Sequence, residues 1–315
     1  MEFTKTVKDN IAIYNVKPIL NENDFVKLQN TRIKPQQIKL IIDHDADVYT
    51  DSGELLLKFR KNKISSDHTT LFYDNVISHA LNKTSNRGST TGSTSKNVSD
   101  NDPTMTNIFG FFDTLSPKQK WLIKQKKLKN ILSVRQTRFN MDHPQKYENA
   151  LPLIRKIDKL YKEYIPKKYK LQRKKADETP FKIDNTAFTT ITTNVNFQTT
   201  IHKDKGDDAE GFGNLSVIER GEYTGGETCF PKYGVGVNVK TGDILFMDVH
   251  EWHANLPIKL KTKDAKRLSI VCYLRHNIWK NTKNKSHKFM VNHNKIIMNL
   301  RSNNKTKKNK KNNKI

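Results

Sequence analysis

Residues 186–276 hold short segments rich in Thr, Val, Ile and Phe, separated by glycine-containing turns. Strands favour these residue types, and glycine supplies the backbone conformations that tight turns need. The segments cover 186–197, 215–219, 226–230, 234–239, 243–249 and 267–274. Many short strands at this spacing predict a sandwich, a barrel or a jelly roll.

Two helices are predicted before this block. Ser116 followed by Pro117 is a favourable helix start, so a helix is expected over 117–133. Apolar residues recur at three- and four-residue spacing over 146–164, which predicts a second helix. Both segments are rich in lysine on their outer faces. A solvated helix face and a phosphate-facing surface both explain that pattern.

Composition divides the chain into four parts. Residues 1–83 form a folded N-terminal region to which the sequence assigns no role. Residues 84–104 are rich in Ser, Thr, Gly and Asn, which predicts a flexible linker or an inserted loop. The main domain is expected over 105–285. Residues 301–315 carry seven basic and no acidic side chains, which predicts a disordered tail.

The net charge of +25 favours a polyanionic partner, most often nucleic acid. AT-rich coding is the alternative explanation, because it would also enrich Lys, Asn and Ile. No run of about 18 apolar residues exists, so we expect neither a membrane span nor a secretory signal. The only two cysteines, Cys229 and Cys272, exclude a disulfide scaffold and are predicted to be buried strand residues without chemistry.

A metal-binding pattern lies inside the β-rich block. His202 and Asp204 are two residues apart, so on a strand end their side chains point to the same side. A more distant histidine can complete a set of two imidazoles and one carboxylate, the facial triad of non-haem Fe(II) oxygenases. Catalytic zinc sites use the same ligand types. Spacing alone leaves His250 and His253 as candidates for the third ligand.

An arginine starts the last predicted strand. Burying Arg267 is costly unless it meets an anion, and its planar fork matches a carboxylate. Ser269 lies two residues further and faces the same way, so its hydroxyl can add a hydrogen bond. The pair is suited to the C5 carboxylate of 2-oxoglutarate. The alternative is an internal ion pair between Arg267 and Asp243 or Asp248.

Taken together, these motifs resemble the TET/JBP oxygenases, and most closely the JBP-type thymine hydroxylase domain. The resemblance covers roughly residues 130–280. It rests on the runs FTTITTNVNF (188–197), HKDKGD (202–207), GFGNLSVI (211–218), GEYTGG (221–226), FP (230–231), GDILFMDVHEWH (242–253) and RLSIVCYLR (267–275), with RQTRF (135–139) upstream.

The resemblance implies an α+β chain with a double-stranded β-helix (jelly-roll) core and flanking helices. It implies Fe(II) held by His202, Asp204 and His253, and 2-oxoglutarate and O2 as cosubstrates, with Arg267 on the 2-oxoglutarate. The family oxidises the 5-methyl group of a pyrimidine, thymine or 5-methylcytosine, in nucleic acid. Three further residues are expected to support the site or to face the cofactor or base: Asn194, Asn196 and His250.

We therefore expect a monomeric dioxygenase that acts on nucleic acid, DNA foremost, in the nucleus or another DNA-containing compartment. Three alternatives stay open: a 2-oxoglutarate-dependent hydroxylase of protein side chains, a catalytically silent DNA-binding protein on the same fold, and a β-sandwich protein that coats nucleic acid without iron.

Overall fold

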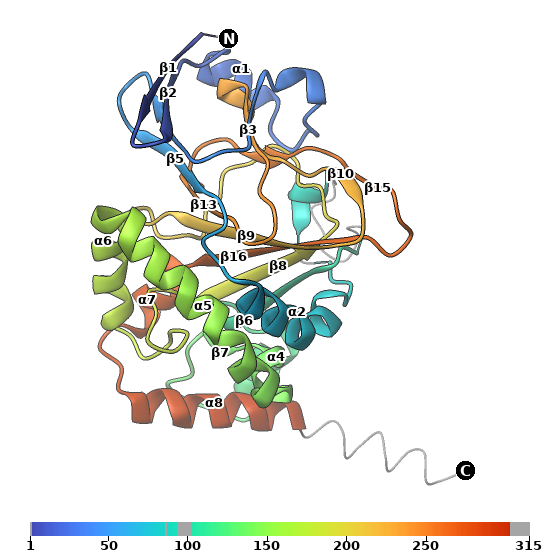
Figure 1. Ribbon diagram of the computed structural model, residues 1–315. Coiled ribbons are helices and arrows are strands. Elements are labelled where there is room, and N and C mark those ends of the chain that lie inside the picture. Colours follow the sequence, from blue (N-terminus) through green and yellow to red (C-terminus); the bar gives the residue numbers. More distant parts are fainter. Residues whose placement is uncertain (1, 86, 93–102, 303–315) are drawn as a thin grey trace.

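A ten-stranded mixed sheet forms the centre of the molecule (Figure 1). The computed structural model describes residues 2–85, 87–92 and 103–302. The strands of the sheet, in spatial order, are β1 (Phe3–Lys8), β2 (Ile11–Val16), β4 (Ala46–Thr50), β5 (Leu55–Arg60), β13 (Ile244–Met247), β9 (Gly213–Arg220), β16 (Lys266–Tyr273), β8 (Thr190–Val195), β6 (Thr106–Phe112) and β7 (Arg135–Gln136).

A smaller sheet packs on one face of this large sheet. Its order is β14 (Ala254–Asn255), β11 (Thr228–Phe230), β12 (Val235–Val237) and β3 (Leu40–Ile42). An apolar core fills the space between the two sheets, with Leu245 and Val217 from the large sheet and Phe230 and Val235 from the small one. Two facing sheets are the expected jelly-roll core, so this prediction is confirmed.

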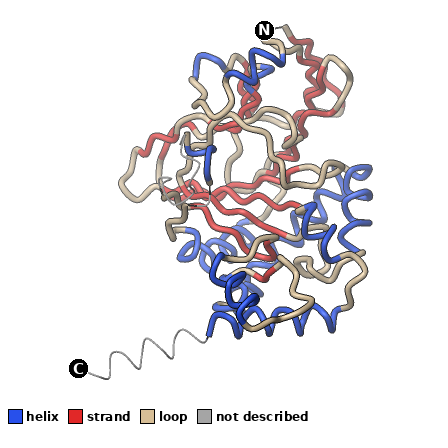
Figure 2. Tube along the Cα trace, turned by 180° about the vertical axis from the view of Figure 1, so that it is seen from behind, coloured by secondary structure: helices blue, strands red, loops and turns tan. Residues whose placement is uncertain are grey.

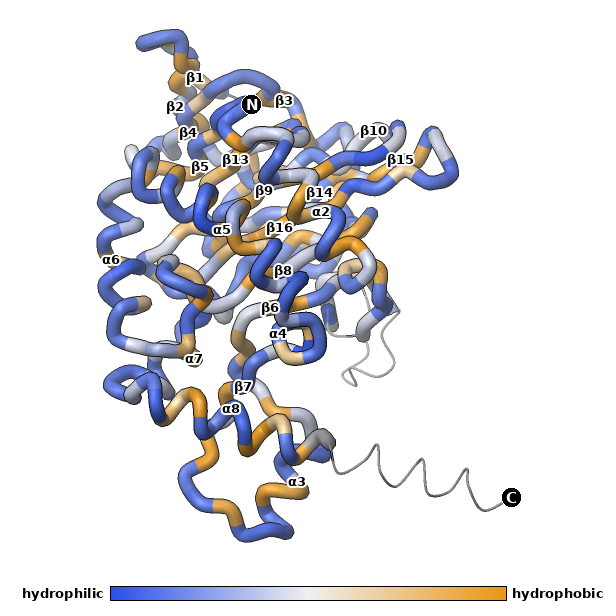
Figure 3. The backbone as a smooth tube through the Cα atoms, turned by 60° about the horizontal axis from the view of Figure 1, so that its bottom comes forward, coloured by the Kyte–Doolittle hydropathy of each residue, from blue (hydrophilic) through white to orange (hydrophobic). Residues whose placement is uncertain are grey.

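Helices cover the other face of the large sheet (Figures 1 and 2). The helices of this layer are α2 (Ser66–Ala80), α4 (Arg138–Asp142) and α5 (Pro144–Tyr164), with α6 (Pro166–Asp177) following α5. The apolar stripe of α5 is buried in a core that also contains Ile191 and Ile270 of the sheet. The periodicity over 146–164 therefore predicted this helix correctly. Hydrophilic and hydrophobic residues alternate along the α5 tube, in keeping with one exposed and one buried side (Figure 3).

The helix predicted over 117–133 is shorter than expected. Ser116 caps α3 (Pro117–Gln125) in a capping box with Gln119, as the sequence indicated. The helix ends because Lys127 adopts a left-handed φ of 48°. The following turn still buries Leu128 and Ile131 partly, against α8 (His287–Ser302). The apolar spacing beyond Gln125 thus belongs to a turn.

Residues 1–83 do not form a separate body. Strand β5 pairs with β13 of the jelly roll, and β3 pairs with β12 of the small sheet. Within residues 84–104, Thr84 and Thr104 pair with each other, and η2 (Gly88–Thr91) lies against the core. The described part of this segment is therefore an inserted loop that packs on the fold. The predicted tail lies outside the described residues from 303 onward.

The remaining structural expectations concern cysteines and membranes. Cys229 and Cys272 are free and fully buried in strands β11 and β16, as predicted. Within the described residues, we find no helix that combines the length and the apolar character required to cross a bilayer.

Candidate functional site

Two histidines and one aspartate converge at the end of the small sheet. The backbones of His202 and His253 pair in an isolated antiparallel bridge, with N–H···O distances of 3.0 and 2.9 Å. The amide of Asp204 donates to the carbonyl of Val249 at 2.9 Å, which fixes the second segment against the first. One ligand atom from each of His202, Asp204 and His253 lies within 4.8 Å of the others.

In both imidazoles, Nδ1 lies at a backbone carbonyl and Nε2 points toward the Asp204 carboxylate. Nδ1 of His202 lies 2.7 Å from the carbonyl of Thr200, and Nδ1 of His253 lies 2.9 Å from that of Glu251. The two Nε2 atoms lie 3.5 and 3.8 Å from the Asp204 carboxylate. A backbone carbonyl at Nδ1 fixes the tautomer that leaves Nε2 free for a metal, so this donor set fits Fe(II).

The protonation states also suit a metal site. Burial, reinforced by the neighbouring His202, lowers the pKa of His253 to about 4, so its imidazole is neutral near pH 7. Burial raises the pKa of Asp204, but the hydrogen bond with His202 and the positive charges around it outweigh burial and hold the pKa below its usual range. Neutral imidazoles and a carboxylate are the forms that bind a metal.

His250 lies outside this group. Its Nδ1 is 3.1 Å from the carbonyl of Asp204 and its Nε2 is 3.3 Å from that of Asp208. Both ring nitrogens thus face the backbone of the loop that follows Asp204. Of the two histidines that spacing left open, only His253 lies with His202 and Asp204, which favours it as the third ligand.

A cavity of about 90 Å³ adjoins the metal-binding group. Arg267, Ser269 and Val271 alternate along β16 and line it together with the three converging residues. Arg267 is 5% exposed, and burial lowers the pKa of its guanidinium. Across the described residues, no carboxylate lies within ion-pair distance of Arg267.

The alternative of an internal ion pair for Arg267 is therefore wrong. Asp243 accepts from the amides of Asn62 and Lys240, both at 3.0 Å, and pairs with Lys61. Asp248 accepts from the amide of His250 at 2.9 Å. Both aspartates are thus used in turns, where short acidic side chains commonly bond nearby amides.

Gly226 makes room for the arginine. Its φ is +81°, and a Cβ at this position would lie 2.8 Å from Cδ of Arg267. Tyr223 of β10 (Tyr223–Gly225) hydrogen-bonds Arg267 and donates to Glu219 at 2.6 Å. The sequence analysis did not connect these residues with the arginine. The Gly-Gly pair was a signal, because a backbone that passes close to a side chain needs glycine.

Asn194 and Asn196 have different roles. Asn194 lines the cavity, donates to the hydroxyl of Ser269 at 3.2 Å and accepts from Nη2 of Arg87 at 2.8 Å. Asn196 has a φ of 49°, accepts from the amide of Arg267 at 2.7 Å and donates to the carbonyl of Ala265 at 2.9 Å. Asn196 thus closes the strand end, and Asn194 faces the cavity.

Arg87 was missed entirely by the sequence analysis. It comes from the Ser/Thr/Gly-rich loop, lies 5.6 Å from the Phe197 ring centroid and lines the cavity opposite the strands. Its Nε is buried and has no hydrogen-bond partner among the described residues. Its guanidinium is attracted most strongly by the carboxylate of Asp204. No local pattern identifies such a residue, because its partners lie more than 100 positions away.

A second cavity, of about 280 Å³, lies on the other side of Asp204 and Arg87, which line both. Phe112, Tyr273, Arg275 and Asp207 contribute to its walls. Burial and the nearby Asp204 charge raise the pKa of the Asp207 carboxyl.

The guanidinium of Arg275 is held in place from two sides. It lies 4.8 Å from the centroid of the Phe112 ring and pairs with Asp113 at 3.0 Å. The second cavity thus combines aromatic rings with a fixed cation and a carboxyl group.

Comparisons with known proteins agree with this geometry. Residues 121–276 match the TET/JBP family model, described as the oxygenase domain of the 2OGFeDO superfamily. The chain is 34% identical over 175 residues to the bifunctional helicase and thymine dioxygenase JBP2 of Trypanosoma cruzi (strain CL Brener), which is 55% of this chain and 15% of that protein. It is 34% identical over 146 residues to the thymine dioxygenase JBP1 of Trypanosoma brucei brucei, which is 46% of this chain and 17% of that protein.

A solved structure shares the fold. NgTET1 in complex with 5mC DNA superposes with a TM-score of 0.53 at 15% identity, covering 88% of this chain and 99% of that one. The alignments to the two curated relatives span only about a sixth of the length of those proteins. Through residues 121–276, the chain belongs to the TET/JBP family of oxygenases, in the superfamily that uses Fe(II), 2-oxoglutarate and O2.

Proposed function

We propose that the protein hydroxylates the methyl group of a 5-methylpyrimidine, thymine or 5-methylcytosine, in DNA. The observation that carries this proposal is the pair of cavities that meet at Asp204 and Arg87. One cavity has the groups that a dicarboxylate cosubstrate needs, and the other has those that bind a planar base. The names of the relatives, thymine dioxygenases, support the same substrate class.

In this proposal His202, Asp204 and His253 hold Fe(II) through Nε2 and carboxylate oxygens. The bound iron would supply O2 activation coupled to oxidation of 2-oxoglutarate. The protein contributes the orientation of the ligands, because the backbone bridge and the two Nδ1 contacts hold both rings. It also keeps water away, since both histidines are more than 90% buried.

The cosubstrate binds in the smaller cavity. Arg267 receives the distal carboxylate in a fork, and Ser269 adds a hydroxyl that Asn194 orients. Arg87 places a second cation on the metal side of the cavity, where its charge acts on Asp204 and His253. The negative charges of an anion with a carboxylate at each end would therefore be compensated by Arg267 at one end and by Arg87 at the other.

The target base binds in the larger cavity. Flipped bases are stacked on aromatic rings and recognised by hydrogen bonds along their pairing edge. Tyr273 and Phe112 offer the rings, Arg275 offers fixed N–H donors, and Asp207 offers a carboxyl group. Because Asp204 lines this cavity too, a base held here lies beside the metal ligands.

The charge of the chain supports a nucleic-acid partner. Lysines crowd the exposed faces of α3, α5 and α6, and the 25 excess positive charges of the sequence would attract phosphates. A DNA substrate places the protein in the nucleus or another DNA-containing compartment. We propose that it acts there as a monomer.

The test is a reaction with Fe(II), 2-oxoglutarate and oligonucleotides that carry thymine or 5-methylcytosine, followed by mass spectrometry of the nucleosides. A 5-hydroxymethyl base that forms only with both cofactors supports the proposal, and Asp204→Ala is the matched inactive control. Succinate formation with no modified base on either oligonucleotide would reject the nucleic-acid substrate and favour another class, such as a protein side chain.

A further inference from the structure

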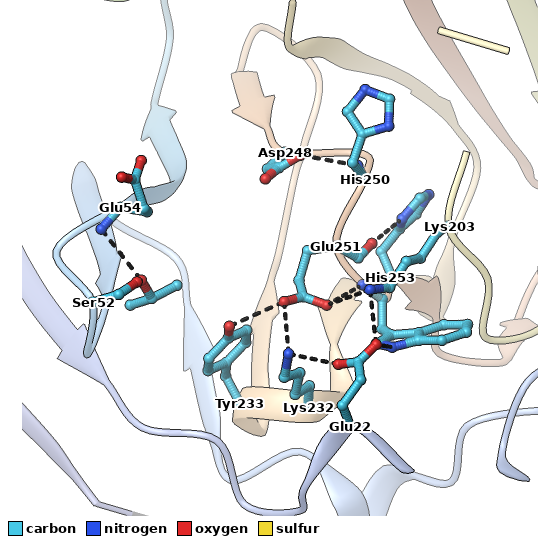
Figure 4. A network of polar contacts seen from close by, with 12 residues as sticks. Glu22, Ser52, Glu54, Lys203, Lys232, Tyr233, Asp248, His250, Glu251 and His253 are labelled. Atoms are coloured by element: carbon cyan, nitrogen blue, oxygen red, sulfur yellow. Dashed lines mark hydrogen bonds and ion pairs between the residues drawn. The ribbon is translucent and has the colours of Figure 1, made fainter. Parts of the chain in front are cut away.

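A network of polar contacts joins the N-terminal region to the two segments that carry the metal-binding residues (Figure 4). Its centre is the carboxylate of Glu22, the first residue of α1 (Glu22–Lys27). Oε1 of Glu22 accepts from Nζ of Lys203 at 3.0 Å and from Nε1 of Trp252 at 2.8 Å. Lys203 stands between His202 and Asp204, and Trp252 directly precedes His253.

One carboxylate oxygen therefore contacts a neighbour of every metal-binding residue. Lys203 also lies 4.8 Å from the centroid of the Trp252 ring, so the two segments touch each other beneath Glu22. Oε2 of Glu22 accepts from Lys232 of η4 (Pro231–Tyr233) at 2.8 Å. Glu251 also pairs with both lysines, at 3.6 Å from Lys203 and 3.1 Å from Lys232. Among the described residues, however, only the Glu22 carboxylate accepts from both lysines and from the Trp252 indole.

A second carboxylate extends the network toward His253. Glu251 accepts from Lys232 at 3.1 Å, from the hydroxyl of Tyr233 at 3.0 Å and from the amide of Trp252 at 2.7 Å. The backbone carbonyl of the same residue accepts the Nδ1 contact of His253 at 2.9 Å. The orientation of the His253 ring thus depends on where Glu251 is held.

The backbone and the apolar core reinforce these polar contacts. The amide of Asn30 donates to the carbonyl of Ile201, and the amide of Ile201 donates to that of Thr31, both at 2.9 Å. Phe25 of α1 is 1% exposed and shares an apolar cluster with Trp252 and Ile201. Residues 21–31 are thus attached to the segment around His202 by side-chain contacts, by backbone hydrogen bonds and by apolar packing.

We propose that Glu22 is a positioning residue for the metal site, which holds the His202–Asp204 and Trp252–His253 segments at the separation that metal binding needs. The proposal rests on the assignment of His202, Asp204 and His253 as the metal ligands. It gives the N-terminal region a function that its sequence did not indicate. Residues that orient metal ligands typically change metal affinity or activity about 10- to 100-fold when they are lost.

The experiment measures Co(II) affinity and the Co(II) absorption spectrum of the full-length protein, with thermal melting of the metal-free form. Glu22→Gln keeps the shape and removes the charge, so it should weaken Co(II) binding about 10-fold or more and alter the spectrum. Asp24→Asn is the matched control on the same helix, because the polar contacts of Asp24 with other described side chains are those to Asn21 and Lys27. It should leave Co(II) affinity unchanged.

A double-mutant cycle tests the route of the effect. Trp252→Phe removes the N–H donor and keeps the ring, so the effects of Glu22→Gln and Trp252→Phe should be less than additive on Co(II) affinity. If Glu22→Gln does not fold, Trp252→Phe alone provides the measurement.

Three outcomes would overturn the proposal. They are wild-type Co(II) affinity in Glu22→Gln, equal losses in Glu22→Gln and Asp24→Asn, and full additivity with Trp252→Phe. Asp204→Ala distinguishes a failure of the ligand assignment from a failure of the positioning role of Glu22. If Asp204→Ala retains wild-type Co(II) affinity, the ligand assignment itself is wrong; if only Glu22→Gln does, the assignment stands and the positioning role falls.

Discussion

Replacing Arg267 with lysine should raise the KM for 2-oxoglutarate while Fe(II) affinity stays constant. The guanidinium is 5% exposed, and no carboxylate among the described residues lies within ion-pair distance, so Glu219 and Glu227 attract its charge only from further away. A bound carboxylate would accept two parallel N–H bonds from arginine, whereas the lysine ammonium offers a single point contact. Loss of one charge-assisted hydrogen bond costs about 1.5–3 kcal/mol, which corresponds to roughly 10- to 150-fold in KM.

The assay follows succinate formation against 2-oxoglutarate concentration at saturating oligonucleotide. Arg220→Lys is the matched control, because Arg220 lies on the neighbouring strand β9 and its guanidinium contacts the Glu219 carbonyl and the Tyr73 ring. Gly226→Ala should reproduce the Arg267→Lys result, since the added Cβ would press on Cδ of Arg267. An unchanged KM in Arg267→Lys together with a lower melting temperature would refute the reasoning and leave Arg267 as a structural residue.

Three further predictions address the site and the tail. The variants His202→Ala, Asp204→Ala and His253→Ala should each abolish turnover and metal binding. His250→Ala should retain measurable turnover in the succinate assay. Turnover in His253→Ala with none in His250→Ala would contradict the assignment. The metal-free protein should lose thermal stability as the pH falls from about 6.5 toward 4. The pKa of His253 is about 4 in the folded protein and 6.5 in the unfolded chain, so the unfolded chain binds the proton first. A melting temperature that stays constant over this pH range would contradict the prediction. Deleting residues 303–315 removes six basic side chains and should reduce the salt slope of DNA affinity by up to about 5, without changing base preference; an unchanged slope would assign the tail another role.

The sequence predicted the features that depend on local pattern. Strand composition and glycine turns located the β-rich core, the family resemblance specified a jelly roll, and the three- and four-residue spacing located α5. The two-residue spacing predicted that His202 and Asp204 lie together, and they do, but in the loop between β8 and β9 and not at the expected strand end. Each of these signals lies within a few residues, where the period of a helix or strand fixes which side chains share a face.

The features that were missed depend on contacts between distant segments. Arg87 meets Asn194 across 107 positions, and Glu22 meets Trp252 across 230. A polar loop residue and an exposed helix residue look alike in the sequence whether or not they reach a site. The choice between His250 and His253 was ambiguous for the same reason, because the backbone pairing of His202 with His253 is a tertiary contact that spacing does not encode.

The position of Asp204 explains why the two cavities belong to one site. Its carboxylate faces His202 and His253, and its residue lines both the Arg267 cavity and the Asp207 cavity. Arg87 lines both as well, and Asn194 ties its guanidinium to Ser269. Any anion in the smaller cavity therefore changes the charge that a ligand meets in the larger one. A chain that only coated nucleic acid would have no need for the buried Arg267 and the half-buried Arg87 around a histidine–aspartate group, because a buried guanidinium is costly to desolvate without a bound anion.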